Sequence, residues 1–413
     1  MKLFDELLWR GMVKDVSDYE LAKKRINEES LRFYIGYDPT GKSLTVGHLV
    51  QIVRMRLMQL HGHTPIVLIG GATGQIGDPR EVGERKLITI EEALNNAKLI
   101  EKQISKYLDP KQTIYVNNYD WISKISLTDF LRDYGKHFNV NYMLAKDIIA
   151  SRLETGISYT EFSYMILQSL DFVHLYENYN CQMQFGGSDQ WGNITAGLEL
   201  LRKMVGDNDA IGISSPLLLK SDGQKFGKSE GGAIWLDPEL TSPYEMYQYF
   251  LNTADEDALE VLKKLTLLPI DEIKRLDNEI KTNPEAREAQ KVLAKEITTF
   301  VHGKEAFEEA LAISEALFSG EFNNLNERSF KELSRALEGV KIEEGKPLVD
   351  ALIETKLAQS KREAREFISN GAISVNDEKI TDTYYELTSD KALHKNFIVI
   401  KRGRRRHGVV YFK

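Results

Sequence analysis

The chain has 413 residues, of which 42% are hydrophobic and 28% are charged, the balance of a protein that folds around sizeable cores. A single cysteine and the lack of clustered Cys and His residues exclude a disulfide framework and a zinc site, and no apolar run could span a membrane. The net charge is −8, but residues 345–413 carry 14 Lys and Arg against 9 Asp and Glu, while the rest of the chain carries 40 against 53. This asymmetry favours an acidic catalytic body with a basic C-terminal binding module, and without a signal-peptide pattern we expect a cytoplasmic protein.

The first third of the chain alternates strand and helix patterns. Short apolar runs bounded by turn residues predict strands, and apolar residues at helical spacing predict helices. The expected elements are strands at 31–37, 65–70 and 113–117 and helices at 46–61 and 90–107. This alternation predicts a parallel, doubly wound sheet, which binds ligands at the carboxyl ends of its strands.

The stretch DPTGKSLTVGH, residues 38–48, joins the first of these strands to the first of these helices. Gly47 allows a close approach to the backbone, the free N–H groups of a helix start attract anions, and His48 adds a donor nearby. On this stretch alone, an ordinary strand–helix turn is an equal alternative.

This stretch resembles the first signature of class I aminoacyl-tRNA synthetases, usually His-Ile-Gly-His, and its flanks resemble the tyrosyl-tRNA synthetases. Here Thr45 replaces the first histidine of that signature. The resemblance implies that Thr45 and His48 act in catalysis at the phosphates of ATP. It also implies that ATP contacts Gly36, Asp38, Thr40, Gly47 and His48.

The second strand runs into GGATGQIGDP, a glycine cluster that permits close backbone approach but is as readily a structural turn. The resemblance implies that Asp78, helped by Thr73, binds the amino group of the amino acid, as a carboxylate suits an ammonium. In the following loop, Arg85 matches a family arginine that acts on the phosphates, while Val82 stands near an expected lysine. Asn118, after the third strand, would contact neighbours of the amino-acid pocket, unless it simply forms a turn.

Tyr164, Gln168 and Asp171 fall on one face of an otherwise apolar helix expected from Ser158 to Tyr176. A buried aspartate needs partners or a ligand, so the face is either the polar wall of a pocket or a satisfied core network. The resemblance implies that Tyr164 and Gln168 bind the tyrosine ammonium and that Asp171, with Tyr34, binds the phenolic hydroxyl.

GGSDQWGN, residues 186–193, matches a specific signature of the same family. It implies that Gly187 and Asp189 bind ATP, with Asp189 on the ribose hydroxyls, and that Gln190 lies near the carboxylate being activated. Leu217–Leu219 is expected to form another strand, followed by a loop in which KFGKS resembles the second class I signature. Lys225, Lys228 and Ser229 of that loop would stabilise the charge on departing pyrophosphate.

The rest of the chain divides by pattern. We expect a Rossmann-like catalytic domain at 1–241, an α-helical domain at 242–335, a linker at 336–346 and a small α+β RNA-binding domain resembling the S4 module at 347–413. Its RNA contacts are assigned to Arg402, Arg404, Arg405 and Arg406. The aromatic segment 129–147 lies where the family has its subunit interface, which implies a homodimer.

The resemblance covers essentially the whole chain and implies an enzyme that attaches L-tyrosine to tRNA(Tyr). The tyrosine carboxylate attacks the α-phosphorus of ATP, with Mg²⁺ as counter-charge, and tyrosine then passes from the adenylate to the tRNA. Two alternatives remain open at this point: a tryptophanyl-type synthetase, against which Asp171 and Tyr34 argue, and a non-catalytic RNA-binding paralogue.

Overall fold

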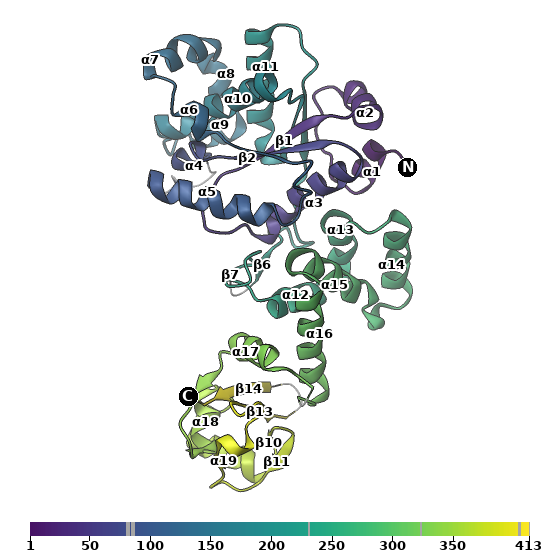
Figure 1. The fold of residues 1–413 in the computed structure, drawn as a ribbon, viewed down its shortest axis with the longest axis vertical. Helices are drawn as coiled ribbons and strands as arrows, with labels where there is room; N and C mark the ends of the chain where they lie inside the picture. The colour runs from purple at the N-terminus through teal and green to yellow at the C-terminus, as the bar shows by residue number, and fades with distance from the viewer. Residues whose placement is uncertain (80–82, 84–86, 230–231, 323, 404–405, 413) are drawn as a thin grey trace. The chain divides into compact units, whose positions relative to one another are not determined.

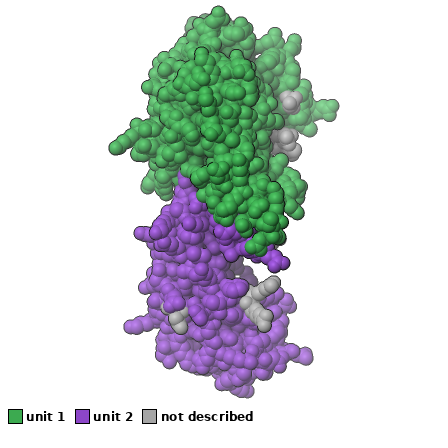
Figure 2. Space-filling view, turned by 90° about the vertical axis from the view of Figure 1, so that its right-hand side faces the viewer, with its two compact units in different colours: residues 1–237, 254–284 green, residues 238–253, 285–413 purple. Residues whose placement is uncertain are grey.

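The computed structural model describes residues 1–413 except 80–82, 84–86, 230–231, 323, 404–405 and 413. The chain packs as two compact units (Figure 2). The first comprises Met1–Asp237 and Ala254–Pro284, and the second comprises Pro238–Thr253 and Glu285–Lys413.

The first unit is built on a parallel five-stranded sheet with the order β3-β2-β1-β4-β5. The strands are β1 (Arg32–Tyr37), β2 (Thr64–Ile69), β3 (Ile114–Asn117), β4 (Met183–Gly187) and β5 (Ile211–Ser215). The predicted parallel sheet is confirmed, with its first three strands within a residue of their expected positions. Strand order reverses between β1 and β4, so a crevice is expected at their carboxyl ends.

Helices cover both faces of this sheet (Figure 1). The long ones are α3 (Val46–Leu60), α5 (Ile90–Ile104), α10 (Tyr159–Tyr179) and α11 (Trp191–Val205). Shorter helices are α1 (Leu3–Trp9), α2 (Tyr19–Glu28), α4 (Thr73–Ile76), α6 (Tyr119–Ile122), α7 (Leu127–Asp129), α8 (Val140–Leu144) and α9 (Asp147–Arg152). Figure 1 shows α3 and α5 on one side of the sheet and α10 and α11 on the other.

The strand expected at Leu217–Leu219 is wrong. Leu219 makes only an isolated bridge with Lys225, and Leu217 and Leu219 are exposed. The fifth strand is instead β5, whose five residues are all buried. Gly212, Ser214 and Ser215 leave β5 with too weak an apolar signal to be recognised in the sequence.

Two helices from the predicted α-helical domain pack in the first unit, namely α13 (Asp255–Leu265) and α14 (Ile270–Thr282). Arg10, which is fully buried at the end of α1, connects them to the N-terminal body. Its guanidinium donates to the carbonyls of Lys263, Thr266 and Leu268 at 3.1, 3.1 and 2.7 Å. Carbonyl oxygens at helix ends accept such bonds readily, because they lack partners within the helix.

The second unit joins a helical part to a mixed sheet. Its helices are α12 (Pro243–Leu251), α15 (Glu288–His302), α16 (Lys304–Ser319), α17 (Glu327–Ala336), α18 (Leu348–Glu354) and α19 (Lys361–Ser369). The sheet has the order β11-β10-β13-β14-β8. Its strands are β8 (Val340–Lys341), β10 (Ile373–Val375), β11 (Glu378–Ile380), β13 (Phe397–Arg402) and β14 (Arg406–Tyr411), and β9 (Lys346–Pro347) pairs separately with β12 (Glu386–Leu387).

The segment 336–346 is part of this second unit and not a separate linker. It contains β8, which pairs in parallel with β14, and Ile342 is only 2% exposed in the core. Phe330 and Leu333 of α17 pack against Phe397 and Val409 of the same sheet. The remaining predicted domain boundaries stay predictions. Within the part of the chain that is described, no helix is long and apolar enough to cross a membrane.

Candidate active site

A cavity of about 460 Å³ lies where β1 and β4 end, at the switch point of the first unit's sheet. Residues from β1, the start of α3, the turn after β2, the middle of α10 and the turn after β4 line it. The predicted site residues on its wall are Tyr34, Gly36, Asp38, Thr40, Gly47, His48, Thr73, Asp78, Tyr164, Gln168, Asp171, Gly187, Asp189, Gln190 and Lys225. The structure therefore brings together side chains that are up to 191 positions apart in the chain, Tyr34 and Lys225 being the extremes.

Tyr34 and Asp171 form the most buried part of the wall, each 1% exposed. The Asp171 carboxylate accepts hydrogen bonds from Asn118 Nδ2 at 3.0 Å and Trp121 Nε1 at 2.9 Å. Among the residues that the structure describes, none makes a hydrogen bond with the Tyr34 hydroxyl. Burial raises the pKa of Asp171 to about 8, against the opposing effect of its two donors, and burial also raises the pKa of Tyr34. A ligand hydroxyl suits this part of the cavity, because a buried polar group left unpaired is costly.

A second group of polar side chains is built around two carboxylates. Asp38 accepts from Thr73 Oγ1 at 2.7 Å and from Tyr164 Oη at 2.8 Å. Asp78 accepts from Gln190 Nε2 at 2.7 Å and from Asn193 Nδ2 at 3.2 Å. Two carboxylates beside one cavity suit a cationic group of a ligand.

The pKa of Asp78 is raised to about 6. Burial is the largest cause, and the hydrogen bond from Gln190 opposes it, while the charge of Asp38 raises the pKa further. Asn193 also donates to Gln168 Oε1 at 3.1 Å and so connects that amide to Asp78.

Two glycines of the GGATGQIGDP turn are required by this arrangement. A Cβ atom on Gly70 would overlap the Asp38 carboxylate and the Thr73 hydroxyl, and one on Gly71 would overlap the side-chain amide of Asn117. Asn118 reaches the cluster from the same side, donating to Thr73 Oγ1 at 3.0 Å while its Oδ1 accepts from the Ala72 N–H at 2.8 Å. Asn118 thus connects the two polar groups from behind the wall.

The start of α3 presents His48 to the cavity. Its Nδ1 accepts from the backbone N–H of Thr45 at 3.1 Å and lies 3.0 Å from the Thr45 hydroxyl. Because Nδ1 accepts, the neutral imidazole carries its proton on Nε2. Desolvation lowers the pKa of His48, which keeps the ring neutral. Thr45 does not line the cavity, and it is connected to the cavity wall by its contacts with His48.

The KFGKS loop packs directly on this helix start. Gly227 has a φ of +88°, and a Cβ atom there would contact the side chain of Val46 and the N–H of Gly47 at 3.3 Å. The Ile234 N–H donates to the Gly227 carbonyl, and the Val46 N–H donates to the Ile234 carbonyl, both at 2.9 Å. Lys225 thereby reaches the cavity wall.

Some predicted catalytic residues cannot be placed. Lys228 and Ser229 form the short strand β6, which pairs with β7 (Gly232–Ala233). The structure describes the backbone of these two residues but not their side chains. Arg85 lies outside the described residues altogether.

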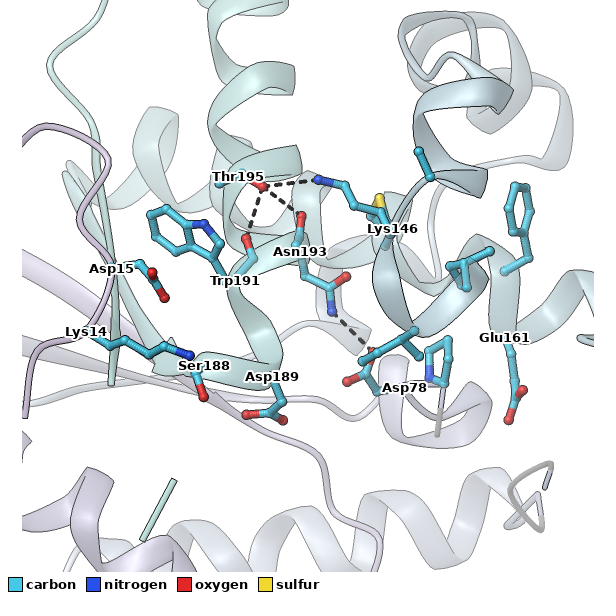
Figure 3. A pocket seen from close by; sticks show the side chains of 17 residues that line it. Lys14, Asp15, Asp78, Lys146, Glu161, Ser188, Asp189, Trp191, Asn193 and Thr195 are labelled. Atoms are coloured by element: carbon cyan, nitrogen blue, oxygen red, sulfur yellow. Dashed lines mark hydrogen bonds between the residues drawn. The ribbon is translucent and has the colours of Figure 1, made fainter. Parts of the chain in front are cut away.

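A second cavity of about 470 Å³ adjoins the first and shares Asp78 and Asp189 with it. Figure 3 shows the side-chain amide of Asn193 reaching toward Asp78. It also shows the amines of Lys14 and Lys146 and the indole of Trp191, which line the same cavity. Lys146 Nζ donates to Tyr142 Oη at 2.6 Å and to Thr195 Oγ1 at 3.4 Å. Asp78 and Asp189 thus lie on the walls of both cavities, and the second cavity is lined by four acidic residues, two lysines and the aromatic rings of Phe162 and Trp191.

Three residues that the sequence analysis did not assign take part in the site: Trp121, Asn193 and Gln51. Asn193 belongs to the GGSDQWGN signature and Trp121 follows Asn118 by three positions, so both lay in recognised segments. Gln51 lies on α3 one turn after Gly47 and His48, and this helical spacing was the signal in the sequence that could have placed it on the same face as those two residues.

The basic tail is only partly open to a ligand. The Arg402 guanidinium donates to the Leu357 carbonyl, lies 4.2 Å over the Phe367 ring and is 3.9 Å from Glu363. Arg406 is exposed, and Arg404 and Arg405 fall outside the described residues. In the first unit, the segment expected at a subunit interface exposes Leu131, Val140 and Tyr142.

The chain is similar to known proteins over its whole length. A family model described as tRNA synthetases class I (W and Y) matches residues 26–319, and one described as the tyrosine–tRNA ligase SYY-like C-terminal domain matches residues 329–410. The tyrosine–tRNA ligase of Onion yellows phytoplasma (strain OY-M) is 49% identical over 413 residues, covering 100% of both chains. Tyrosine–tRNA ligase 1 of Bacillus subtilis (strain 168) is 48% identical over 419 residues, covering 100% of this chain and 99% of that one.

Among solved structures, a C-terminally truncated mitochondrial tyrosyl-tRNA synthetase of Aspergillus nidulans is similar at a TM-score of 0.69 and 30% identity. The match covers 77% of this chain and 94% of that one.

Proposed function

The chain belongs to the tyrosine–tRNA ligases, a family of class I tRNA synthetases, and on that premise we propose that it joins L-tyrosine to tRNA(Tyr) at the expense of ATP. The tryptophanyl alternative loses its support, because the C-terminal match and the full-length relatives are those of tyrosine–tRNA ligases. The proposal places the protein in the cytoplasm, where both ATP and tRNA are found.

The observation that carries tyrosine recognition is the buried hydroxyl of Tyr34 beside Asp171, for which the described part of the chain offers no hydrogen-bond partner. In the proposed complex the phenolic hydroxyl of the substrate donates to the Asp171 carboxylate and accepts from Tyr34. Asn118 and Trp121 hold the carboxylate in place from the other side. The hydroxyl of the substrate thus supplies a partner for the Tyr34 hydroxyl and a third donor for Asp171, and phenylalanine cannot do so.

The substrate ammonium is assigned to Asp78, Tyr164 and Gln168, with Thr73 in support. A cation between Asp78 and Asp38 would be favoured by both carboxylates. Gln190, which donates to Asp78 at 2.7 Å, would lie beside the substrate carboxylate. Because the ammonium and the hydroxyl are both bound, the carboxylate is left facing the start of α3 and the GGSDQWGN turn.

ATP is assigned to the opposite wall, with Mg²⁺ entering on its phosphates as part of the substrate. The residues proposed to contact ATP are Gly36, Asp38, Thr40, Gly47, His48, Gly187, Asp189 and Lys228. The tyrosine carboxylate oxygen forms a bond to the α-phosphorus while the bond to the bridging oxygen of pyrophosphate breaks. His48 Nε2–H and the positive charges of Lys225, Lys228 and Arg85, with Ser229, would stabilise the leaving group, so catalysis is positioning and charge stabilisation.

The second step needs access for a tRNA end, and the second cavity reaches Asp78 and Asp189 with Trp191 on its wall, between two lysines and the further carboxylates of Asp15 and Glu161. An aromatic side chain suits a stacked base of the tRNA end. The exposed Arg406, together with Arg402, Arg404 and Arg405, is proposed to contact tRNA elsewhere. A homodimer through the exposed apolar segment that includes Leu131 and Val140 completes the proposal.

Aminoacylation tests the proposal directly. The full chain, incubated with ATP, Mg²⁺ and bacterial tRNA, should attach labelled tyrosine to tRNA and should leave labelled tryptophan free. Incorporation of tryptophan in place of tyrosine, or of neither by a folded chain, would refute it.

A further inference from the structure

His174 lies one helical turn after Asp171 on α10. The spacing of three positions places the two residues on one face of that helix. Trp121, from the short helix α6, lies across this face. Its Nε1 donates to the Asp171 carboxylate at 2.9 Å, and its indole stacks on the His174 ring, with the ring centroids 4.2 Å apart and the planes 16° from parallel.

The helix that carries Trp121 does not hold the indole in place by itself. α6 has only four residues, none of which is buried, and a helix of that length is not stable alone. The indole also packs against the apolar cluster that includes Tyr34 and Phe172, but apolar contacts have no preferred direction. A single hydrogen bond from Nε1 leaves the indole free to turn about that bond, and a ring stacked on its face blocks the turn.

The His174 ring is itself held, and it is neutral. Asn178 Nδ2 donates to the His174 carbonyl at 2.9 Å and lies 3.4 Å from Nδ1 of the ring. Because an amide NH₂ group only donates, Nδ1 is the acceptor and the ring proton is assigned to Nε2. Desolvation lowers the pKa of His174, and the charge of Lys124, just after α6, lowers it further. Near pH 7 the stack is therefore a pair of neutral aromatic rings.

The alignment of the Trp121 donor matters because Asp171 is proposed to meet the substrate hydroxyl as a carboxylate. Burial raises the pKa of Asp171 to about 8, and the hydrogen bonds from Asn118 and Trp121 oppose that rise. A hydrogen bond weakens steeply as its angle bends, so a donor that can tilt stabilises the carboxylate less than one that is held. A residue that holds the indole thus acts on tyrosine binding through Asp171.

We propose that His174 is a positioning residue for tyrosine recognition: its ring holds the Trp121 indole so that Nε1–H stays directed at the Asp171 carboxylate, which accepts the substrate hydroxyl. The proposal rests on the proposed function, because it takes tyrosine as the occupant of this part of the cavity. Neither His174 nor Trp121 belongs to the cavity wall that the described residues form, so the effect on tyrosine passes through Asp171.

His174→Leu is the decisive variant, because leucine keeps much of the apolar volume but offers no flat ring. Once the indole can tilt, the KM for tyrosine in ATP–pyrophosphate exchange should rise about two- to tenfold, the range that the strength of an aromatic pair allows. The KM for ATP should stay within about twofold, because the lost interaction acts on tyrosine alone.

The pH dependence gives a second readout, which a purely structural stack would not move. A carboxylate that loses part of a donor has a higher pKa, so the fall in kcat/KM for tyrosine that accompanies protonation of Asp171 should begin at higher pH in His174→Leu. The further fall through about pH 6, which belongs to Asp78, should stay in place.

His174→Phe supplies the rescue and Tyr176→Leu the control. Phenylalanine restores a flat ring but has no proton to exchange, so its KM for tyrosine and its pH profile should match those of the parent. Tyr176 is half-buried like His174 but lies two positions further along α10, on another face, where it packs against Val173 and Leu200. Its replacement by leucine should leave both KM values unchanged. Thermal unfolding shows whether each variant is folded.

The outcomes separate the two levels of the argument. If the parent chain shows no tyrosine-dependent exchange, the proposed function fails and this inference fails with it. If the parent is active and folded His174→Leu keeps the parent KM for tyrosine and the parent pH profile, the stack is structural and only this inference is overturned. An equal rise in the KM for ATP, or a His174→Phe variant as impaired as His174→Leu, would overturn it as well.

Discussion

Replacing Tyr34 by phenylalanine removes one oxygen atom from the most buried part of the cavity. The parent hydroxyl is buried and has no hydrogen-bond partner among the described residues, which costs about 1–3 kcal/mol, so the free chain of the variant should gain stability and not lose it. With tyrosine bound, the variant lacks one neutral hydrogen bond, worth about 0.5–1.5 kcal/mol, while Asp171 still accepts from the substrate. We therefore expect discrimination between tyrosine and phenylalanine to fall about three- to tenfold.

The assay compares kcat/KM for tyrosine and for phenylalanine in ATP–pyrophosphate exchange. Tyrosyl-tRNA synthetases as a class prefer tyrosine over phenylalanine by roughly 10⁴–10⁵, a figure that comes from the class and not from this structure. A three- to tenfold drop from such a preference is measurable. Tyr115→Phe is the control, because Tyr115 lies on β3, two strands away from β1 in the same sheet, with a buried hydroxyl outside this cavity. Unchanged selectivity in Tyr34→Phe, or an equal change in the control, would refute the assignment of Tyr34 to the substrate hydroxyl.

Three further predictions concern other parts of the account. The pKa is raised to about 8 for Asp171 and to about 6 for Asp78, and both are proposed to bind tyrosine as carboxylates, so kcat/KM for tyrosine should fall as the pH drops through about 8 and fall further through about 6. A profile that is flat down to about pH 5 would contradict this. Thr45→Ala removes a hydroxyl that lies 3.0 Å from His48 Nδ1 but keeps the backbone donor, so adenylate formation should slow about two- to tenfold while the affinity for tyrosine stays unchanged. Pre-steady-state rates equal to those of the parent would exclude a role of the Thr45 hydroxyl in adenylate formation. A chain cut after Gly320 should keep pyrophosphate exchange but bind tRNA more weakly, with a shallower dependence of that affinity on salt. A chain cut after Gly345 should be less stable, because it keeps Phe330 but loses the sheet that covers this side chain. Retained tRNA affinity in the chain cut after Gly320 would contradict the assignment of the tRNA contacts.

The sequence predicted the parts of the site that rest on local pattern. Helical spacing placed Tyr164, Gln168 and Asp171 on one face, and all three line the cavity. Partners across the fold were not predictable in this way. Tyr164 donates to Asp38, a residue 126 positions away at the end of β1, and only the packed sheet decides that pairing.

The fold shows the same limit. Its first three strands were predicted from apolar runs, but β5, with a glycine and two serines among its buried residues, gave no such run. The packing of α13 and α14 in the first unit depends on Arg10, whose buried hydrogen bonds to three carbonyls connect positions more than 250 residues apart in the chain. Likewise β8 is a strand because β14 pairs with it, and Val340–Lys341 has no strand signal of its own.

The central claim is that this cavity activates tyrosine with ATP. It is tested most directly by measuring the exchange of labelled pyrophosphate into ATP by the full chain, with tyrosine, tryptophan, phenylalanine or no amino acid present. The account predicts rapid exchange that depends on tyrosine and only background exchange with the other three. Exchange with tryptophan, or no exchange with tyrosine in a chain shown to be folded, would contradict it.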